Sequence, residues 1–253
     1  MGSFFRMVKM DLYRMIRMKI VLLLFLAAAM LTCIVTIRYA EHINTIRESS
    51  YSIETLHKGY SSMMIDAAVN NKKISIWDMS IITFSPLILI FSAAFFIPFF
   101  INDESHYGFL KSISCLVPNR GIIAASKLFT ITIYSICSTA VVFISSFIFS
   151  KLFLGYVYWG SNVTSYIKAF ITMFVLYLAV NFLIALISFL CSNVNTIMII
   201  AALVFSGIQS LFSVIINFVL SLKNQNLVLT AGAFFLVLFA VMSIFIMAKK
   251  DVK

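Results

Sequence analysis

The sequence predicts an all-α, polytopic membrane protein with six transmembrane helices, an N-terminal amphipathic helix at the membrane surface and a short helix on the cytoplasmic face. Three observations lead to this fold class. Of the 253 residues, 62% are hydrophobic and only 11% are charged, and the mean hydropathy is +1.05. Soluble domains carry about 25% charged residues, so lipid must solvate most of this surface. Apolar segments of about 20 residues, the length that crosses a bilayer, take up nearly the whole chain.

The first element is an amphipathic helix over residues 4–18. Its apolar side chains fall within an arc of about 120° at the 3.6-residue period, and they are Phe4, Phe5, Val8, Leu12, Met15 and Ile16. Most of its basic side chains lie away from that arc, and those assigned to this interfacial helix are Arg6, Lys9, Arg14 and Arg17. A basic amphipathic helix directly before a span is expected to lie in the head-group layer. The alternative is a basic flank without a defined helix.

Six apolar segments follow in a single membrane domain, 1–253. The predicted spans are 20–37, 79–101, 128–150, 167–191, 196–220 and 227–248. A polar loop at 38–78 separates the first two spans, and a second one at 102–127 separates the next two. The positive-inside rule places both termini in the cytoplasm, because the first span follows five basic residues, Arg6, Lys9, Arg14, Arg17 and Lys19. The 102–127 loop is then cytoplasmic and the 38–78 loop external.

The formal net charge of +10 does not indicate a nucleic-acid partner in such a chain. Basic residues that flank spans contact anionic lipid head groups, so the expected partner of these charges is membrane lipid. The four cysteines form no CxxC pair and no cluster with histidine, which disfavours a metal site or a disulfide framework. All three histidines fall in predicted loops.

No sequence motif indicates catalysis. The chain contains no GxxxxGK[ST] phosphate loop, no HExxH and no GxSxG, so we expect no enzyme, no catalytic residue and no bound cofactor. The predicted spans contain no charged residue, which disfavours an ion-coupled carrier. Their uncharged polar residues Asn181, Gln209 and Asn217 either line a translocation path or form hydrogen bonds between helices.

The 102–127 loop is the most informative segment. It predicts a short amphipathic helix at 105–116, ended by Pro118, with Lys127 at the entry to the third span. Such a helix either docks into a groove of a soluble partner or serves as an ordinary connector.

This loop resembles the one between the second and third spans of type-2 ATP-binding-cassette (ABC) exporter permeases. The pattern has an acidic residue, a small residue, a basic residue, an apolar run, a turn with arginine and a closing lysine. The matching residues, which the resemblance assigns to coupling with an ATPase subunit, are Glu104, Gly108, Lys111, Pro118, Arg120 and Lys127. The threonine that commonly follows the glycine is Phe109 here.

The resemblance implies a permease subunit in a bacterial-type plasma (inner) membrane, without its own ATPase motif. It implies a homodimer, or a heterodimer with a second permease, and two copies of a separate nucleotide-binding subunit that bind ATP and Mg. The helix at 105–116 would be the coupling helix, and the helix at 4–18 would also touch the ATPase. The proportions are similar to those of lantibiotic-immunity, bacitracin-resistance and peptide-export permeases. These export or expel an amphipathic peptide, an antimicrobial or a lipid-like molecule.

Two other classes stay open on the sequence. An ATPase-independent carrier or channel would keep ionisable groups inside its spans or show Gly-rich broken helices. A membrane-embedded enzyme would show a catalytic cluster at one depth, and a passive immunity or scaffold protein would have no ATPase partner.

Overall fold

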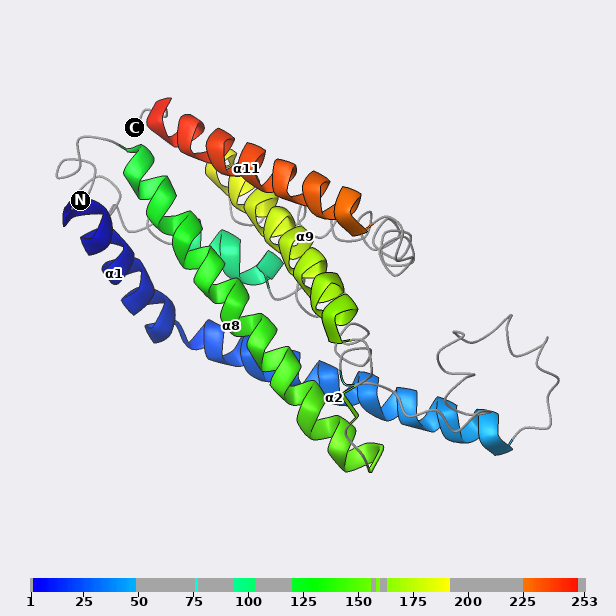
Figure 1. Cartoon of the computed structure of the whole chain (residues 1–253). Helices are drawn as coiled ribbons and strands as arrows, with labels where there is room; N and C mark the ends of the chain where they lie inside the picture. The colour runs from blue at the N-terminus through cyan, green and yellow to red at the C-terminus, as the bar shows by residue number, and fades with distance from the viewer. Residues whose placement is uncertain are drawn as a thin grey trace.

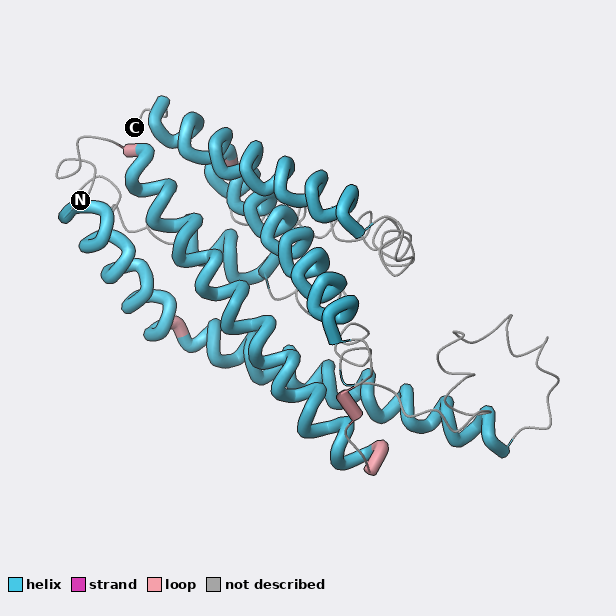
Figure 2. The backbone as a smooth tube through the Cα atoms, viewed as in Figure 1, coloured by secondary structure: helices cyan, strands magenta, loops and turns pink. Residues whose placement is uncertain are grey.

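The computed structural model describes residues 2–48, 76, 93–102, 120–155, 158–159, 163–191 and 225–249. Helices account for nearly all of these residues, and no strand occurs among them (Figure 2). The long helices are α1 (Gly2–Arg17), α2 (Lys19–Glu48), α8 (Gly121–Phe153), α9 (Val163–Leu190) and α11 (Gln225–Lys249). A shorter apolar helix covers Ala93–Asn102. The all-α class is confirmed for the part of the chain that the structure describes.

Four of the described helices are long and apolar enough to cross a membrane. They are Lys19–Thr45, Gly121–Phe153, Ile167–Leu190 and Asn226–Lys249. These correspond to the first, third, fourth and sixth predicted spans, and they give the chain the character of a membrane protein. The predicted span at 196–220, most of 79–101, and most of both polar loops lie outside the described residues.

The helix α2 is longer than the predicted first span at 20–37. Residues 38–48, which we predicted as the start of the external loop, continue the helix to Glu48. At 1.5 Å per residue its 30 residues span about 45 Å, whereas the hydrocarbon core is about 30 Å thick. Its last turns, with an exposed Arg38–Glu41 ion pair at 3.4 Å, extend past the other described helices (Figure 1). The hydropathy pattern ends with the apolar core, while the polar residues that follow still favour helix.

The helix α8 begins at Gly121 instead of at residue 128. The residues from Gly121 to Lys127 therefore form its first turns, and the prediction that they belong to the loop is wrong. Its 33 residues span about 50 Å, more than the hydrocarbon core requires. One end of α8 thus carries Arg120 and Lys127 and the other carries Lys151.

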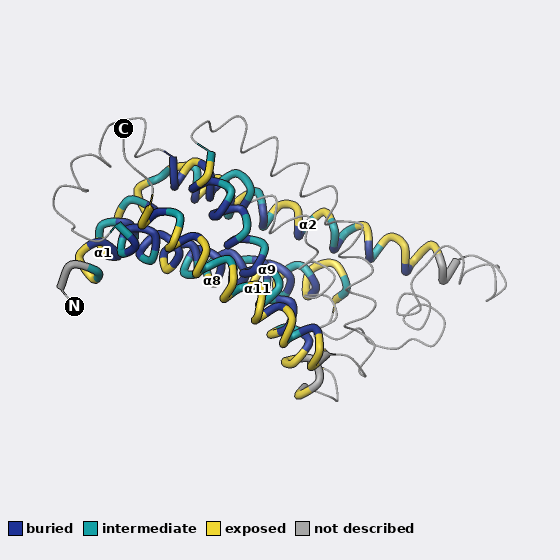
Figure 3. Tube along the Cα trace, turned by 90° about the horizontal axis from the view of Figure 1, so that it is seen from above, coloured by how far each residue is buried: buried dark blue, intermediate teal, exposed yellow. Residues whose placement is uncertain are grey.

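Burial places α8 and α9 at the centre of the bundle. The most apolar window of α9 is 56% buried and that of α8 is 44% buried, against 28% for α2 and 17% for α11. Figure 3 shows the exposed positions along α2 and α11. The helix α11 packs along α9, and α1 and α2 pack against α8. At Gly232 of α11 a Cβ atom would lie only 3.2 Å from Leu176 Cδ2 of α9, so a side chain there would push these helices apart.

Candidate functional site

Five side chains from three elements meet at the end of the bundle where α1 lies beside the start of α8 (Figure 1). We call them the basal cluster, and they are Asp11, Arg14, Phe100, Ser126 and Lys127. The first two come from α1, Phe100 from the helix Ala93–Asn102, and the last two from α8. Phe100 is close to the point where segment 103–119 leaves the described structure, and Lys127 follows shortly after the chain returns. The cluster therefore lies at the base of that segment.

Phe100 is the platform of the basal cluster. Its ring is fully buried, with Lys127 Nζ 5.1 Å from the ring centroid and Arg14 Cζ 5.4 Å from it. Both distances lie within the reach of about 6 Å at which a cation is attracted to the face of an aromatic ring. Phe96, one turn earlier, stacks on Phe100 at 5.2 Å and fixes its orientation. One ring thus connects α1 and α8 through two cations.

Asp11 joins α1 to α8 directly. Its side chain is 1% exposed, and Ser126 Oγ donates a hydrogen bond of 2.5 Å to its Oδ2 atom. Its other oxygen, Oδ1, lies 3.9 Å from Arg14 Nη1. A buried carboxylate is costly unless it is paired and hydrogen-bonded, and these two contacts meet that need. They fix how α1 is rotated against α8.

The sequence analysis did not single out Asp11 and assigned Lys127 to a loop. Both side chains are only 1% exposed, so ionisable groups are buried at this end of the bundle. For Lys127 the error follows from the earlier start of α8. For Asp11 a signal was present, because Met7, Asp11 and Met15 recur every four residues, and all three lie on the buried face of α1.

The predicted amphipathic helix exists at nearly the predicted position, as α1. Its apolar arc is divided: Val8 and Met15 pack against the bundle, while Phe5 and Ile16 are 65% and 75% exposed. Arg14 belongs to the basal cluster. The other basic residues assigned to the interfacial helix, Arg6, Lys9 and Arg17, are exposed.

Only two of the six predicted coupling residues fall within the described structure. Arg120 occupies the N-cap position of α8 and is half-buried. Lys127 belongs to the basal cluster. The other four, Glu104, Gly108, Lys111 and Pro118, lie outside the described residues.

A second polar group joins α8 and α9 in the interior. Asn181 Nδ2 donates to Ser135 Oγ at 2.7 Å, and Ser138 Oγ lies 3.2 Å from the hydroxyl oxygen of Tyr177. We call these four residues the polar bridge, and all of them are buried. Of the two interpretations of Asn181, its amide nitrogen fits the hydrogen bond between helices. Gln209 and Asn217 lie outside the described residues.

Replacing Asn181 by leucine is expected to change the free energy of unfolding by less than about 1 kcal/mol, because two effects oppose each other. The change removes the hydrogen bond to Ser135, and it also removes a buried amide oxygen, Oδ1, that has no hydrogen-bond partner among the described residues. Unfolding of the purified variant in detergent measures the difference, with Ser135→Ala as the matched variant. A loss several times larger would contradict the prediction and indicate that Oδ1 has an important partner elsewhere in the chain.

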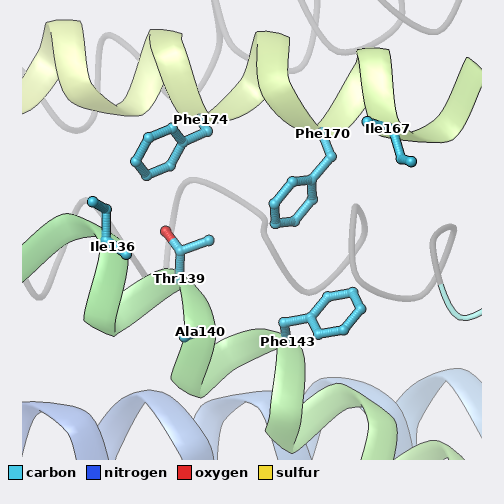
Figure 4. Close-up of a pocket in the computed structure, with 7 residues that line it drawn as sticks. All are labelled: Ile136, Thr139, Ala140, Phe143, Ile167, Phe170 and Phe174. Atoms are coloured by element: carbon cyan, nitrogen blue, oxygen red, sulfur yellow. The ribbon is translucent and has the colours of Figure 1, made fainter. Parts of the chain in front are cut away.

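An apolar groove of about 470 Å³ lies between α8 and α9 (Figure 4). Its lining residues are Ile136, Thr139, Ala140, Phe143, Ile167, Phe170 and Phe174. The hydroxyl of Thr139 donates to the backbone oxygen of Ser135 at 2.7 Å. The groove therefore presents an apolar surface next to the polar bridge.

No family model, curated protein or solved structure matches the chain. Within the described ranges, no group of three or more His, Cys, Asp or Glu residues could hold a metal ion. The basal cluster, the polar bridge and the groove are thus the local features from which a function can be inferred.

Proposed function

We propose that the chain is the permease subunit of a type-2 ABC exporter, which expels an amphipathic substrate with ATP hydrolysed by a separate subunit. The observation that carries this proposal is the basal cluster. It joins the start of α8 to the helix that precedes segment 103–119, the segment in which the family's coupling helix is expected. The same cluster includes α1, the helix that is expected to touch the ATPase as well.

The contacts of the basal cluster suit the transfer of a movement. A displacement of segment 103–119 would act on Phe100 at one end and on Lys127 at the other. Arg14 contacts the same ring, and Asp11 is bonded to Ser126, so α1 would move with both. Packed interiors respond to such a displacement by shifting as units, because their side chains leave little free space. This is the behaviour that an ATPase-driven permease requires at its cytoplasmic base.

The proposal includes six spans with both termini in the cytoplasm of a bacterial-type plasma membrane. The permease pairs with a second copy or with a sister permease. Two nucleotide-binding subunits hold ATP and Mg, and this chain holds neither. The basic residues at the basal end, Arg6, Lys9, Arg14, Arg17, Arg120 and Lys127, support the cytoplasmic placement of that end.

The groove between α8 and α9 supports an amphipathic cargo. Its walls are apolar, and through Thr139 it adjoins the polar bridge. A molecule with one apolar and one polar side fits such a surface better than a small ion does. We infer a peptide, an antimicrobial or a lipid-like molecule as the substrate class.

A carrier or channel without an ATPase is the second candidate. The buried Asp11 and Lys127 favour it, since ionisable groups inside the membrane often belong to ion pathways. Their position argues the other way. Both lie at one end of the bundle, and Asp11 already has Ser126 and Arg14 as partners, an arrangement expected of a structural connection.

A pull-down of the tagged chain from its native membrane in mild detergent tests the function. We expect a soluble ATPase in stoichiometric amount, and any second six-span protein beside it would indicate a heteromeric permease. Recovery of this chain alone, repeated after crosslinking, would reject the proposal in favour of the ATPase-independent candidate.

The substitution Glu104→Lys is expected to uncouple ATP hydrolysis from transport while the chain still inserts and assembles. The resemblance gives Glu104 a role in anchoring the coupling region, and reversal of its charge would replace an attraction by a repulsion. Transport and ATPase activity of reconstituted complexes measure the effect. The matched control is Glu41→Lys, at an exposed position near the far end of α2. Equal and full coupling in both variants would show that Glu104 has no such role.

A further inference from the structure

An open groove of about 510 Å³ lies where the start of α8 meets the end of α11. Six of its lining residues are Phe4, Ile122, Ala125, Val241, Ile244 and Phe245. The groove is hollow because small residues, Gly121 and Ala125 on α8 and Ala248 on α11, face it. Phe4 reaches it from the first turn of α1, so three helices that are distant in sequence build one site (Figure 1).

Two basic residues flank the groove. Lys249 Nζ lies 4.3 Å from the ring centroid of Phe245, a lining residue, which brings its ammonium group to the rim. Arg120 directly precedes Gly121 at the N-terminus of α8. Neither α8 nor α11 contains an acidic residue, and the carboxylate of Asp11 on α1 is bonded to Ser126. The local charge on the described walls is therefore positive.

We propose that this groove binds one anionic phospholipid, with an acyl chain along its apolar walls and the phosphate between Arg120 and Lys249. The walls belong to helices that can cross a membrane, and basic residues at the ends of such helices lie at head-group depth. The backbone N–H groups at the start of α8 add partial positive charge to the phosphate position. A phospholipid is the molecule that supplies an apolar chain and an anion together at that depth.

Native mass spectrometry of the full-length chain in mild detergent tests the site. We expect phosphatidylglycerol to be retained in preference to phosphatidylcholine, one molecule per chain at this groove. The variants Lys249→Gln and Arg120→Gln should each weaken retention about fivefold, the effect of one basic residue near an anionic surface. The matched controls Lys151→Gln and Lys168→Gln remove a positive charge from the opposite end of the bundle, and retention should be unchanged in both.

Filling the groove provides a test that leaves the charges intact. Ala125→Phe should abolish the preferential retention, whereas Ala140→Phe, which fills the groove between α8 and α9, should leave it unchanged. Equal retention of both lipids, or a loss in Lys168→Gln equal to that in Lys249→Gln, would overturn the proposal. Displacement of the lipid by water-soluble glycerol phosphate would overturn it as well, because the acyl chain would then contribute nothing. The site does not depend on ABC transport, so its failure would leave the proposed function standing.

Discussion

Replacing Phe100 by alanine is expected to destabilise the protein by about 3–5 kcal/mol, the range for truncating a fully buried aromatic side chain. The ring is completely buried, stacks on Phe96 and carries the side chains of Arg14 and Lys127 on its face. Its loss leaves a cavity and removes the surface on which two cations rest. Unfolding of the purified chain in detergent, followed by loss of helical signal, measures the effect.

Two further variants separate the cavity from the cation contacts. Phe100→Leu keeps most of the apolar volume and loses the aromatic face, so about 1–2 kcal/mol per cation contact is at risk. Phe234→Ala truncates a side chain on α11 that is 64% exposed, and it should be nearly neutral. If Phe100→Ala were no more harmful than Phe234→Ala, the basal cluster would not be a packed unit. The proposal of a mechanical connection would then lose its support.

The sequence predicts the described helices well because their signal is local. Runs of apolar residues longer than about 18 residues indicate spans irrespective of what surrounds them. The helix ends were predicted less well. The polar continuation of α2 to Glu48 and the start of α8 at Gly121 are set by helix propensity and packing after the apolar signal has ended. An apolar window marks the part of a helix that lies in the membrane and leaves its full length open.

The basal cluster was largely beyond the reach of the sequence. Asp11 and Ser126 are separated by 115 positions along the chain, and no local pattern pairs them. Lys127 was noticed only through a family resemblance, without its partner Phe100. Asn181 was identified because a buried amide is unusual within a span, and its partner Ser135 became known only when α8 and α9 were placed side by side. Composition thus indicates which polar residues are unusual, while the fold decides what they contact.

Ser126→Ala is expected to destabilise the protein by about 1–3 kcal/mol, although it removes a single oxygen atom. The reason is that the change leaves the buried carboxylate of Asp11 with only the distant Arg14 contact at 3.9 Å. The reverse change, Asp11→Leu, should cost less. Ser126 Oγ also lies 3.2 Å from the backbone oxygen of Ile123 and can donate there instead. Unfolding in detergent and hydrogen exchange of the α1 amides measure stability and docking.

The double variant Asp11→Leu/Ser126→Ala decides whether the pair acts as a unit. Replacing both partners of a buried hydrogen bond by apolar groups is nearly neutral, so the double variant should be more stable than Ser126→Ala alone. The matched control is Ser188→Ala, at a buried serine of α9 whose printed bond is to Ile184 of its own helix, and it should cost about 0.6 kcal/mol or less. If the two single effects simply add, Asp11 and Ser126 do not interact energetically. The docking of α1 would then depend on Phe100 and the apolar contacts of Met7 and Met15, and movement of segment 103–119 would reach α1 only through Arg14.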